Sequence, residues 1–275
     1  MQGKTAFITG ASRGIGAAIA IKLASLGVNV AVVAKSVEED PRLGGTIHSV
    51  AEKINAAGGN ALPIQCDIRD EQQIIAAVAQ TVEKFGGIDF VINNASAISL
   101  TDTEKTESKR FDLMHDINVR GTFLVTKHCL PYLRQSSGAH ILTLSPPLDI
   151  SPHWIAPFCA YSLSKFNMSM MAMGWSVEFK KDKIASNALW PVTTIATAAV
   201  KNLLGGEQMA LASRTPAIIA DAAAFILGQS TILYTGKCWL DEDLLMLAGV
   251  HDFAKYAVTP GAELQRDLYV SRQPR

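Results

Sequence analysis

The sequence has no excess of charge of either sign and no long apolar run. Lys and Arg together number 25, as do Asp and Glu, so the formal net charge is zero. Proteins that bind nucleic acid or anionic membranes need a basic surplus, and this balance argues against both kinds of partner. No stretch approaches the roughly 18 consecutive apolar residues of a membrane-spanning helix. We therefore expect no nucleic-acid partner and no membrane span.

Cysteine and histidine are scarce and scattered. The four cysteines, Cys66, Cys129, Cys159 and Cys238, include no C-x-x-C pair, which is typical of free thiols in a reducing compartment. The six histidines have no metal-ligand spacing, so we expect no metal site. The N-terminus leads directly into the strand-like segment Thr5–Thr9. We therefore expect no secretory leader and a cytoplasmic location.

The sequence does contain a regular alternation of short apolar runs and amphipathic stretches. The runs are rich in Val, Ile, Leu and Ala and mostly lack polar alternation, which is typical of strands covered on both faces. We predict strands at Thr5–Thr9, Asn29–Ala34, Ala61–Gln65, Asp89–Ile92, His140–Leu144, Ile184–Leu189 and Gly236–Leu240. We predict helices at Ile15–Leu26, Thr46–Ala57, Asp70–Phe85, Arg110–Arg134, Tyr161–Lys180 and Pro216–Leu227. This alternation predicts a single-domain α/β fold of the Rossmann type, a doubly wound parallel sheet of about seven strands with helices on both faces.

The chain after Leu240 has weaker periodicity. It begins with the acidic triplet Asp241-Glu242-Asp243, which we interpret as a solvated turn. We place one domain over residues 1–245 and expect residues 246–275 to form a tail, packed on that domain or on another subunit. Earlier in the chain, Asp70 followed by Gln73 predicts a helix N-cap with a capping-box partner.

A glycine-rich turn follows the first predicted strand and precedes a helix. It reads Gly10-Ala11-Ser12-Arg13-Gly14-Ile15-Gly16. Glycines permit a tight turn and a close approach of the backbone to a ligand, and the N–H groups at a helix N-terminus bind phosphates. The position of this turn between a strand and a helix indicates a dinucleotide site.

The glycine spacing G-x-x-x-G-x-G resembles that of the short-chain dehydrogenase/reductase family. Further motifs of the family follow in order over nearly the whole chain: Asp67-Ile68, Asn93-Asn94-Ala95-Ser96, Asn118, Tyr161-x-x-x-Lys165, and Pro191-Val192 with Thr197. The resemblance implies that Asp67 and Ile68 contact adenine and that Asn94, Ala95 and the Pro191–Thr197 loop also bind the cofactor. Ser96 and Val192 depart from the family pattern because each replaces a glycine.

Tyr161 and Lys165 are the expected catalytic pair. Residues four apart share one face of a helix. A phenol has an ordinary pKa of about 10, and a nearby ammonium lowers that pKa by favouring the phenolate. Tyr161 then takes a proton from an alcohol or gives one to a carbonyl oxygen. The resemblance implies that Lys165 also binds the ribose hydroxyls and that Asn118 orders a water in the proton path.

The family also uses a serine that hydrogen-bonds the substrate oxygen. It usually closes a Ser-Ser pair after the fifth strand, where this sequence has Ser145-Pro146. Three alternatives are open: Ser145 replaces the missing hydroxyl, Ser151 supplies it, or the role is absent. We assign it to Ser145. The segment that continues to Phe158 is either a wall of the substrate pocket or a rigid surface loop.

The residue that follows the second strand bears on the choice of cofactor. NAD-specific folds of this type place a carboxylate there, about 20 residues beyond the glycine-rich turn. This sequence has Lys35, and Arg13 lies within the turn. Two cations attract the 2′-phosphate of NADP(H), whereas solvated surface cations are the alternative reading. We predict NADP(H) as the cofactor and NAD(H) as the weaker ligand, although the acidic segment 38–40 reduces this preference.

Two segments, Leu144-Ser-Pro-Pro-Leu148 and Asn187-Ala-Leu-Trp-Pro191, are similar to a narrower group of this family. Animal members of that group carry a C-terminal lipid-binding domain of the sterol-carrier type, which we do not expect here. The resemblance implies an oxidoreductase that interconverts an alcohol and a carbonyl on an apolar or lipid-derived small molecule. It also implies a homodimer or homotetramer formed through the two long central helices. The alternative is a cofactor-binding sensor or scaffold with little turnover.

Overall fold

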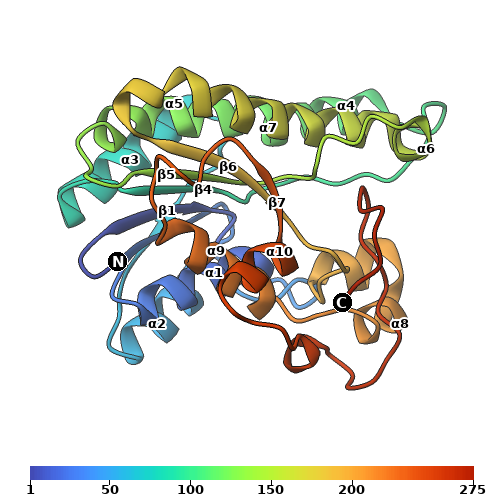
Figure 1. The fold of residues 1–275 in the computed structure, drawn as a ribbon. Coiled ribbons are helices and arrows are strands. Elements are labelled where there is room, and N and C mark those ends of the chain that lie inside the picture. The colour runs from blue at the N-terminus through green and yellow to red at the C-terminus, as the bar shows by residue number, and fades with distance from the viewer.

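The computed structural model describes residues 1–275 and contains one seven-stranded sheet in which all neighbouring strands are parallel (Figure 1). The strands are β1 (Thr5–Thr9), β2 (Asn29–Ala34), β3 (Asn60–Gln65), β4 (Phe90–Asn93), β5 (His140–Leu144), β6 (Ala185–Trp190) and β7 (Cys238–Leu240). Their order is β3-β2-β1-β4-β5-β6-β7, so the winding direction reverses between β1 and β4. The predicted doubly wound sheet is confirmed, and the strand bounds agree with the predicted ones to within one or two residues.

Helices cover both faces of this sheet (Figure 1). One face carries α1 (Gly14–Ser25), α2 (Ile47–Ala56), α9 (Ala217–Leu227) and α10 (Asp241–Leu247). The other carries α3 (Glu71–Phe85), α5 (Thr122–Leu133) and α7 (Cys159–Glu178). The other α-helices are short: α4 (Ser108–Met114), α6 (Pro152–Ile155) and α8 (Gly206–Leu211).

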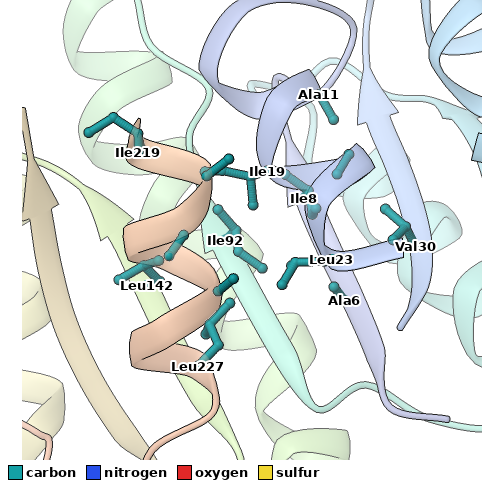
Figure 2. Packing of buried hydrophobic residues seen from close by; sticks show 14 of the residues in the cluster. Ala6, Ile8, Ala11, Ile19, Leu23, Val30, Ile92, Leu142, Ile219 and Leu227 are labelled. Carbon is teal, nitrogen blue, oxygen red and sulfur yellow. The ribbon is translucent and has the colours of Figure 1, made fainter. Parts of the chain in front are cut away.

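The alternation of side chains along the strands explains these two layers. Successive residues of a strand point to opposite faces, so an all-apolar strand needs a cover on each side. Ile8 belongs to the cluster that contains Ile19 of α1 and Ile219 of α9, as Figure 2 shows. Its neighbour Phe7 belongs to a second cluster with Val125 of α5. The sheet is therefore buried on both faces, and a ligand can approach it only at the ends of its strands.

Two local predictions are only partly correct. Asp70 caps α3 as predicted, and its carboxylate accepts hydrogen bonds from the backbone N–H groups of Gln72 and Gln73. The capping box does not form, because the Gln73 amide oxygen accepts from the Asp67 N–H at 2.9 Å. The helix predicted over Arg110–Arg134 is continuous but contains a π-helical segment, His115–Gly121, between α4 and α5. Such segments are frequent at functional sites, and Asn118 lies within this one.

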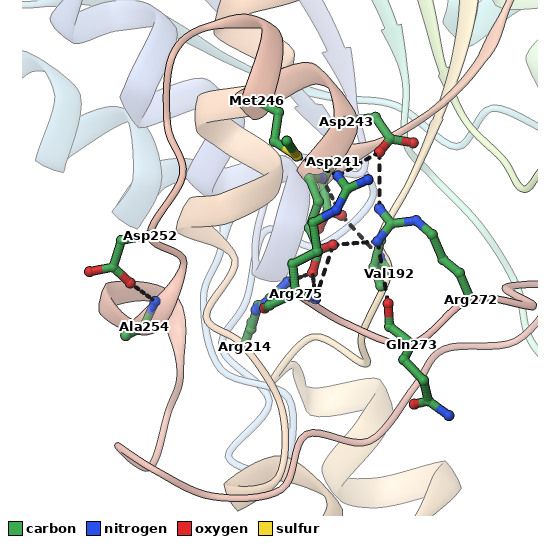
Figure 3. Close-up of polar contacts among 11 residues, drawn as sticks. Val192, Arg214, Asp241, Asp243, Met246, Asp252, Ala254, Arg272, Gln273 and Arg275 are labelled. Carbon is green, nitrogen blue, oxygen red and sulfur yellow. Dashed lines mark hydrogen bonds and ion pairs between the residues drawn. The ribbon is translucent and has the colours of Figure 1, made fainter.

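The acidic triplet is not a solvated turn, and that prediction is wrong. Asp241, Glu242 and Asp243 form the first turn of α10, and Asp241 and Glu242 have no exposed surface. Glu242 accepts hydrogen bonds at 2.6 Å from the guanidinium groups of Arg214 and Arg272. Figure 3 shows Arg214, Arg272 and Arg275 close to Asp241 and Asp243, the neighbours of Glu242. Glu242 is buried because cations that lie far away in the sequence neutralise it, which local composition does not reveal. Asp241 accepts hydrogen bonds from the backbone N–H groups of Val192 and Glu242 instead.

The residues beyond 245 pack closely on the sheet and its helices. Phe253 and Tyr256 are buried beside α9, and Tyr269 and Val270 are buried beside α7. The domain boundary at residue 245 remains a prediction. No helix in the structure combines the length and the apolar composition that crossing a membrane requires.

We predict that Glu242→Gln lowers the free energy of unfolding by about 3 kcal/mol, because the buried Arg214 guanidinium loses its counter-charge. The matched control is Asp243→Asn, since Asp243 is 40% exposed and pairs with Arg272 and Arg275 at the surface. Its loss should cost at most about 1 kcal/mol. Urea unfolding of the two variants measures the difference, and equal losses would contradict this account of the buried pair.

Candidate active site

A cavity of about 1050 Å³ lies at the carboxyl ends of β1, β2, β3 and β4. Its walls come from the glycine-rich turn after β1, from Lys35 and Ser36 after β2, from Asp67 and Ile68 after β3, and from the segment 94–98 after β4. Doubly wound sheets bind ligands in the crevice at this edge, where the winding direction reverses. The fold therefore places most of the predicted dinucleotide residues around one cavity.

The glycine-rich turn is held against the end of β4 by Asn94. The Asn94 amide donates hydrogen bonds to the carbonyl oxygens of Thr9 and Gly10 at 2.9 and 3.1 Å. A Cβ atom at Gly16 would lie only 2.5 Å from the Gly10 carbonyl oxygen, so only glycine fits there. Gly10 itself has a φ of +65°, which favours glycine. Asn94 thus supports the turn directly, in addition to lining the cavity.

The predicted cofactor-binding residues divide into two groups. Those that line the cavity are Gly10, Ser12, Arg13, Gly14, Ile15, Lys35, Asp67, Ile68, Asn94, Ala95 and Thr197. Ala11 and Gly16 are buried behind the turn. Pro191, Val192, Tyr161 and Lys165 are buried on the catalytic side and do not line the cavity.

Cations gather where the cavity meets β2. Lys35 is exposed on the cavity wall, and its positive charge is one of the influences that lower the pKa of Asp67, after the hydrogen bonds from Arg69. Arg13 also lines the cavity, but its guanidinium donates to the carbonyl oxygens of Gly44 and Gly45 at 2.8 and 3.3 Å. Lys35 is therefore the freer of the two predicted cations.

Sequence reasoning missed several cavity residues. Arg42, Arg110, Lys201 and Asn202 also line it. Asn202 donates a hydrogen bond to the Arg42 carbonyl oxygen at 2.8 Å, which joins two segments that lie 160 residues apart. No local motif marks these residues, and only their position on the same cavity as Lys35 indicates a role.

Tyr161 and Lys165 lie in the first two turns of α7 and are almost completely buried, with exposures of 5% and 2%. The Lys165 ammonium donates to the Leu144 carbonyl oxygen at 2.6 Å and lies 5.2 Å from the centre of the Trp190 ring. Burial lowers the pKa of Lys165 to about 7, and the Asp267 carboxylate acts in the opposite direction. Burial also raises the pKa of Tyr161, because a phenolate is poorly solvated there.

Asn118 connects the catalytic helix with the cavity. Its amide donates to Ser164 of α7 and to the Ala97 carbonyl oxygen, both at 2.9 Å. Its carbonyl oxygen accepts from the Ala97 N–H at 2.8 Å. Ala97 lines the cavity and packs against the cluster that contains Tyr161. The predicted residues Asn118, Tyr161 and Lys165 are thus brought together next to the cofactor cavity.

The two candidate serines differ in what they contact. Ser145 is fully buried beside Leu144, and its hydroxyl has no hydrogen-bond partner. Ser151 precedes α6, and its hydroxyl donates to the Asp149 carboxylate. A buried hydroxyl without a partner has a free-energy cost that a ligand oxygen would remove. This difference favours Ser145.

Comparison with known proteins shows the family of this chain. A family profile described as short chain dehydrogenase matches residues 4–207. The chain therefore belongs to the short-chain dehydrogenase family, which consists of oxidoreductases. Over 274 residues it is 52% identical to hydroxysteroid dehydrogenase-like protein 2 of Xenopus tropicalis, and the match covers 100% of this chain and 65% of that protein. The chain thus spans slightly less than two thirds of the length of this relative.

Two solved structures extend the likeness to the fold. A crystal structure of a protein from Xanthomonas campestris is 49% identical and has a TM-score of 0.95, over 98% of this chain and 99% of that chain. A metagenomic short-chain oxidoreductase in complex with NADP is 25% identical, with a TM-score of 0.71 over 87% of this chain and 96% of that chain. The Rossmann-type fold is therefore shared with proteins of the same family.

Proposed function

We propose that this chain is an NADP(H)-dependent oxidoreductase that interconverts an alcohol and a carbonyl, with Tyr161 as the acid/base. The observation that carries the proposal is the meeting of Tyr161, Lys165 and Asn118 beside a cavity at the switch point of the sheet. Residues from separate parts of the chain supply these groups, so their meeting is a property of the whole fold.

The cavity fits the cofactor. The glycine-rich turn and the first turn of α1, which has no side-chain cap, would hold the pyrophosphate. Lys35 and Arg42 would face the adenosine end, and Lys165 would bind the ribose next to the nicotinamide. A bound nicotinamide supplies hydride transfer to or from the substrate carbon.

The residues of this chain would handle the proton. In the reductive direction the Tyr161 hydroxyl gives its proton to the carbonyl oxygen, and in the oxidative direction the phenolate takes it from the alcohol. A protonated Lys165 favours that phenolate and opposes the effect of burial. Asn118 would order a water in the proton path.

The surroundings of Tyr161 support an apolar substrate. Its cluster includes Phe166, Trp190, Val192 and Tyr269. An apolar alcohol or ketone, including a lipid-derived one, would lose little on leaving water for such a site. The name of the relatives refers to hydroxysteroids, which are apolar alcohols.

We also propose a homodimer or homotetramer in the cytoplasm. Leu163, Met170 and Val177 are exposed at seven-residue intervals on α7, one of the two long central helices. An apolar stripe of this kind is typical of a helix that packs against another chain. All four cysteines are free thiols, as is usual in a reducing compartment.

A cofactor-binding sensor or scaffold is the second candidate. The deep burial of Tyr161 and the proline in place of the usual serine at position 146 favour it. The variants below distinguish the two candidates because only an enzyme depends on the Tyr161 hydroxyl.

Tyr161→Phe should abolish turnover and leave NADPH affinity within a few-fold of the wild type, because it removes the proton donor and keeps the ring. The rate at which NADPH absorbance decreases with a panel of aldehydes, ketones and acyl thioesters measures turnover. Tyr132→Phe, on the distant helix α5, is the control and should have normal activity. Near-normal turnover of Tyr161→Phe would refute the mechanism, and a wild type that binds NADPH but reduces nothing would favour the second candidate.

NADPH should bind at least about tenfold more tightly than NADH at low salt, because charge-assisted contacts to the 2′-phosphate each contribute about 1.5–3 kcal/mol. Lys35→Asp should remove most of this difference, and high salt should reduce it. Lys53→Asp is the matched control, since Lys53 is exposed on α2 away from the cavity. Fluorescence titration gives both dissociation constants, and equal values in the wild type would rule out the preference.

Ser145→Ala should lower turnover by more than about tenfold, because a positioned donor to a developing oxyanion contributes about 2.7–4 kcal/mol. Ser151→Ala is the control and should retain activity, since that hydroxyl already binds Asp149. Steady-state kinetics on the best substrate of the panel decides the assignment. The reverse pattern would move the role to Ser151.

A further inference from the structure

The segment Gln265–Val270 runs alongside the loop that follows β6. The Asp267 N–H donates to the Val192 carbonyl oxygen at 3.0 Å, and the Thr194 N–H donates to the Gln265 carbonyl oxygen at 2.9 Å. Farther along, Trp190 donates its indole N–H to the Leu268 carbonyl oxygen at 2.9 Å. Backbone hydrogen bonds thus hold this segment against the Pro191–Thr194 loop.

Tyr269 is the central side chain of the segment. It is 2% exposed, and its ring centre lies 5.1 Å from that of Phe166 and 5.9 Å from that of Trp154. Its hydroxyl lies 2.9 Å from the hydroxyl of Ser162, the residue after Tyr161. Both partners on α7 therefore come from the turns that carry Tyr161 and Lys165.

The backbone of Tyr269 has a φ of +64°, in the left-handed region. A bulky aromatic residue rarely adopts this conformation, and strain of this kind is retained where the surrounding contacts require it. Here the ring packing and the hydroxyl contact hold Tyr269 in place.

Tyr161 and Tyr269 belong to the same buried cluster. A substrate carbonyl that reaches the Tyr161 hydroxyl must therefore pass side chains of this cluster. The cofactor cavity is on the other side, and no residue of the segment 265–270 lines it. The segment therefore bounds the substrate side of the site and leaves the cofactor side free.

We infer that the segment Gln265–Val270 forms the substrate-side wall of the active site and that the Tyr269 ring limits the size of the substrate. The inference rests on the proposed carbonyl chemistry at Tyr161. Arg272, two residues beyond the segment, pairs with the buried Glu242 at 2.6 Å and fixes the far end of the wall. The Tyr269 ring is then a specificity-determining group that the C-terminal part of the chain supplies.

The test compares Tyr269→Ala, which removes the ring, with Tyr269→Phe, which removes only the hydroxyl. Propanal and 4-tert-butylbenzaldehyde serve as the small and the bulky substrate with NADPH. We expect the ratio of kcat/KM for the bulky aldehyde to that for propanal to rise at least about tenfold in Tyr269→Ala, mainly through KM. Tyr269→Phe should keep the wild-type ratio within about twofold, and NADPH affinity should be unchanged in both variants. An unchanged ratio in Tyr269→Ala with normal NADPH affinity would overturn the inference.

A second measurement separates this inference from the proposed function. If the wild type reduces neither aldehyde, the carbonyl chemistry fails on these substrates, and quenching of tryptophan fluorescence by acrylamide tests the wall. Tyr269 covers Trp154 and Trp190, whose ring centres lie 5.9 and 6.2 Å from its own. Tyr269→Ala should raise the quenching constant at least about twofold, and Tyr269→Phe should not. Equal quenching in the wild type and in Tyr269→Ala would show that the ring does not close this side.

Discussion

Burial of the parallel sheet on both faces is the constraint on which the rest of the structure depends. Successive apolar side chains of every central strand point to opposite faces of the sheet, as Phe7 and Ile8 do in β1, so helices must cover each face. Covered faces leave no room for a ligand within the layers. Polar loops and helix N-termini collect instead at the carboxyl ends of the strands, and the cavity forms where the winding direction reverses between β1 and β4.

The two halves of the site differ in their exposure to water. The cofactor cavity is open and is lined by backbone, hydroxyl and cationic groups such as Lys35. The side at the start of α7 is closed, because Lys165 is buried and Tyr161 belongs to an apolar cluster. Burial disfavours the charged form of both groups, so their protonation depends strongly on neighbours. Asp267 is such a neighbour, because its carboxylate opposes the effect of burial on Lys165 and strengthens it on Tyr161.

The C-terminal segment depends on one buried carboxylate. Glu242 lies at the start of α10 and accepts hydrogen bonds from Arg214, from Arg272 and from the backbone N–H of Arg275 (Figure 3). Because Glu242 and Arg214 have almost no exposed surface, each requires the other to compensate for lost solvation. The same contacts hold the chain end near the Pro191–Thr194 loop and thereby help to position Tyr269 over α7.

The sequence by itself determined the parallel sheet and the glycine-rich turn, and it proposed Tyr161, Lys165 and Asn118 as candidate catalytic residues, since hydrophobic periodicity and motif spacing are local signals. It did not reveal that Asp241 and Glu242 are buried, because Glu242 pairs with Arg214 and Arg272, which lie apart in the sequence, and Asp241 accepts a hydrogen bond from the distant Val192 N–H. Nor did it place Arg42 and Asn202 at the cavity or Tyr269 in the same buried cluster as Tyr161. Only the tertiary structure decided these features, because long-range packing sets which side chains share a low-dielectric interior and which face water.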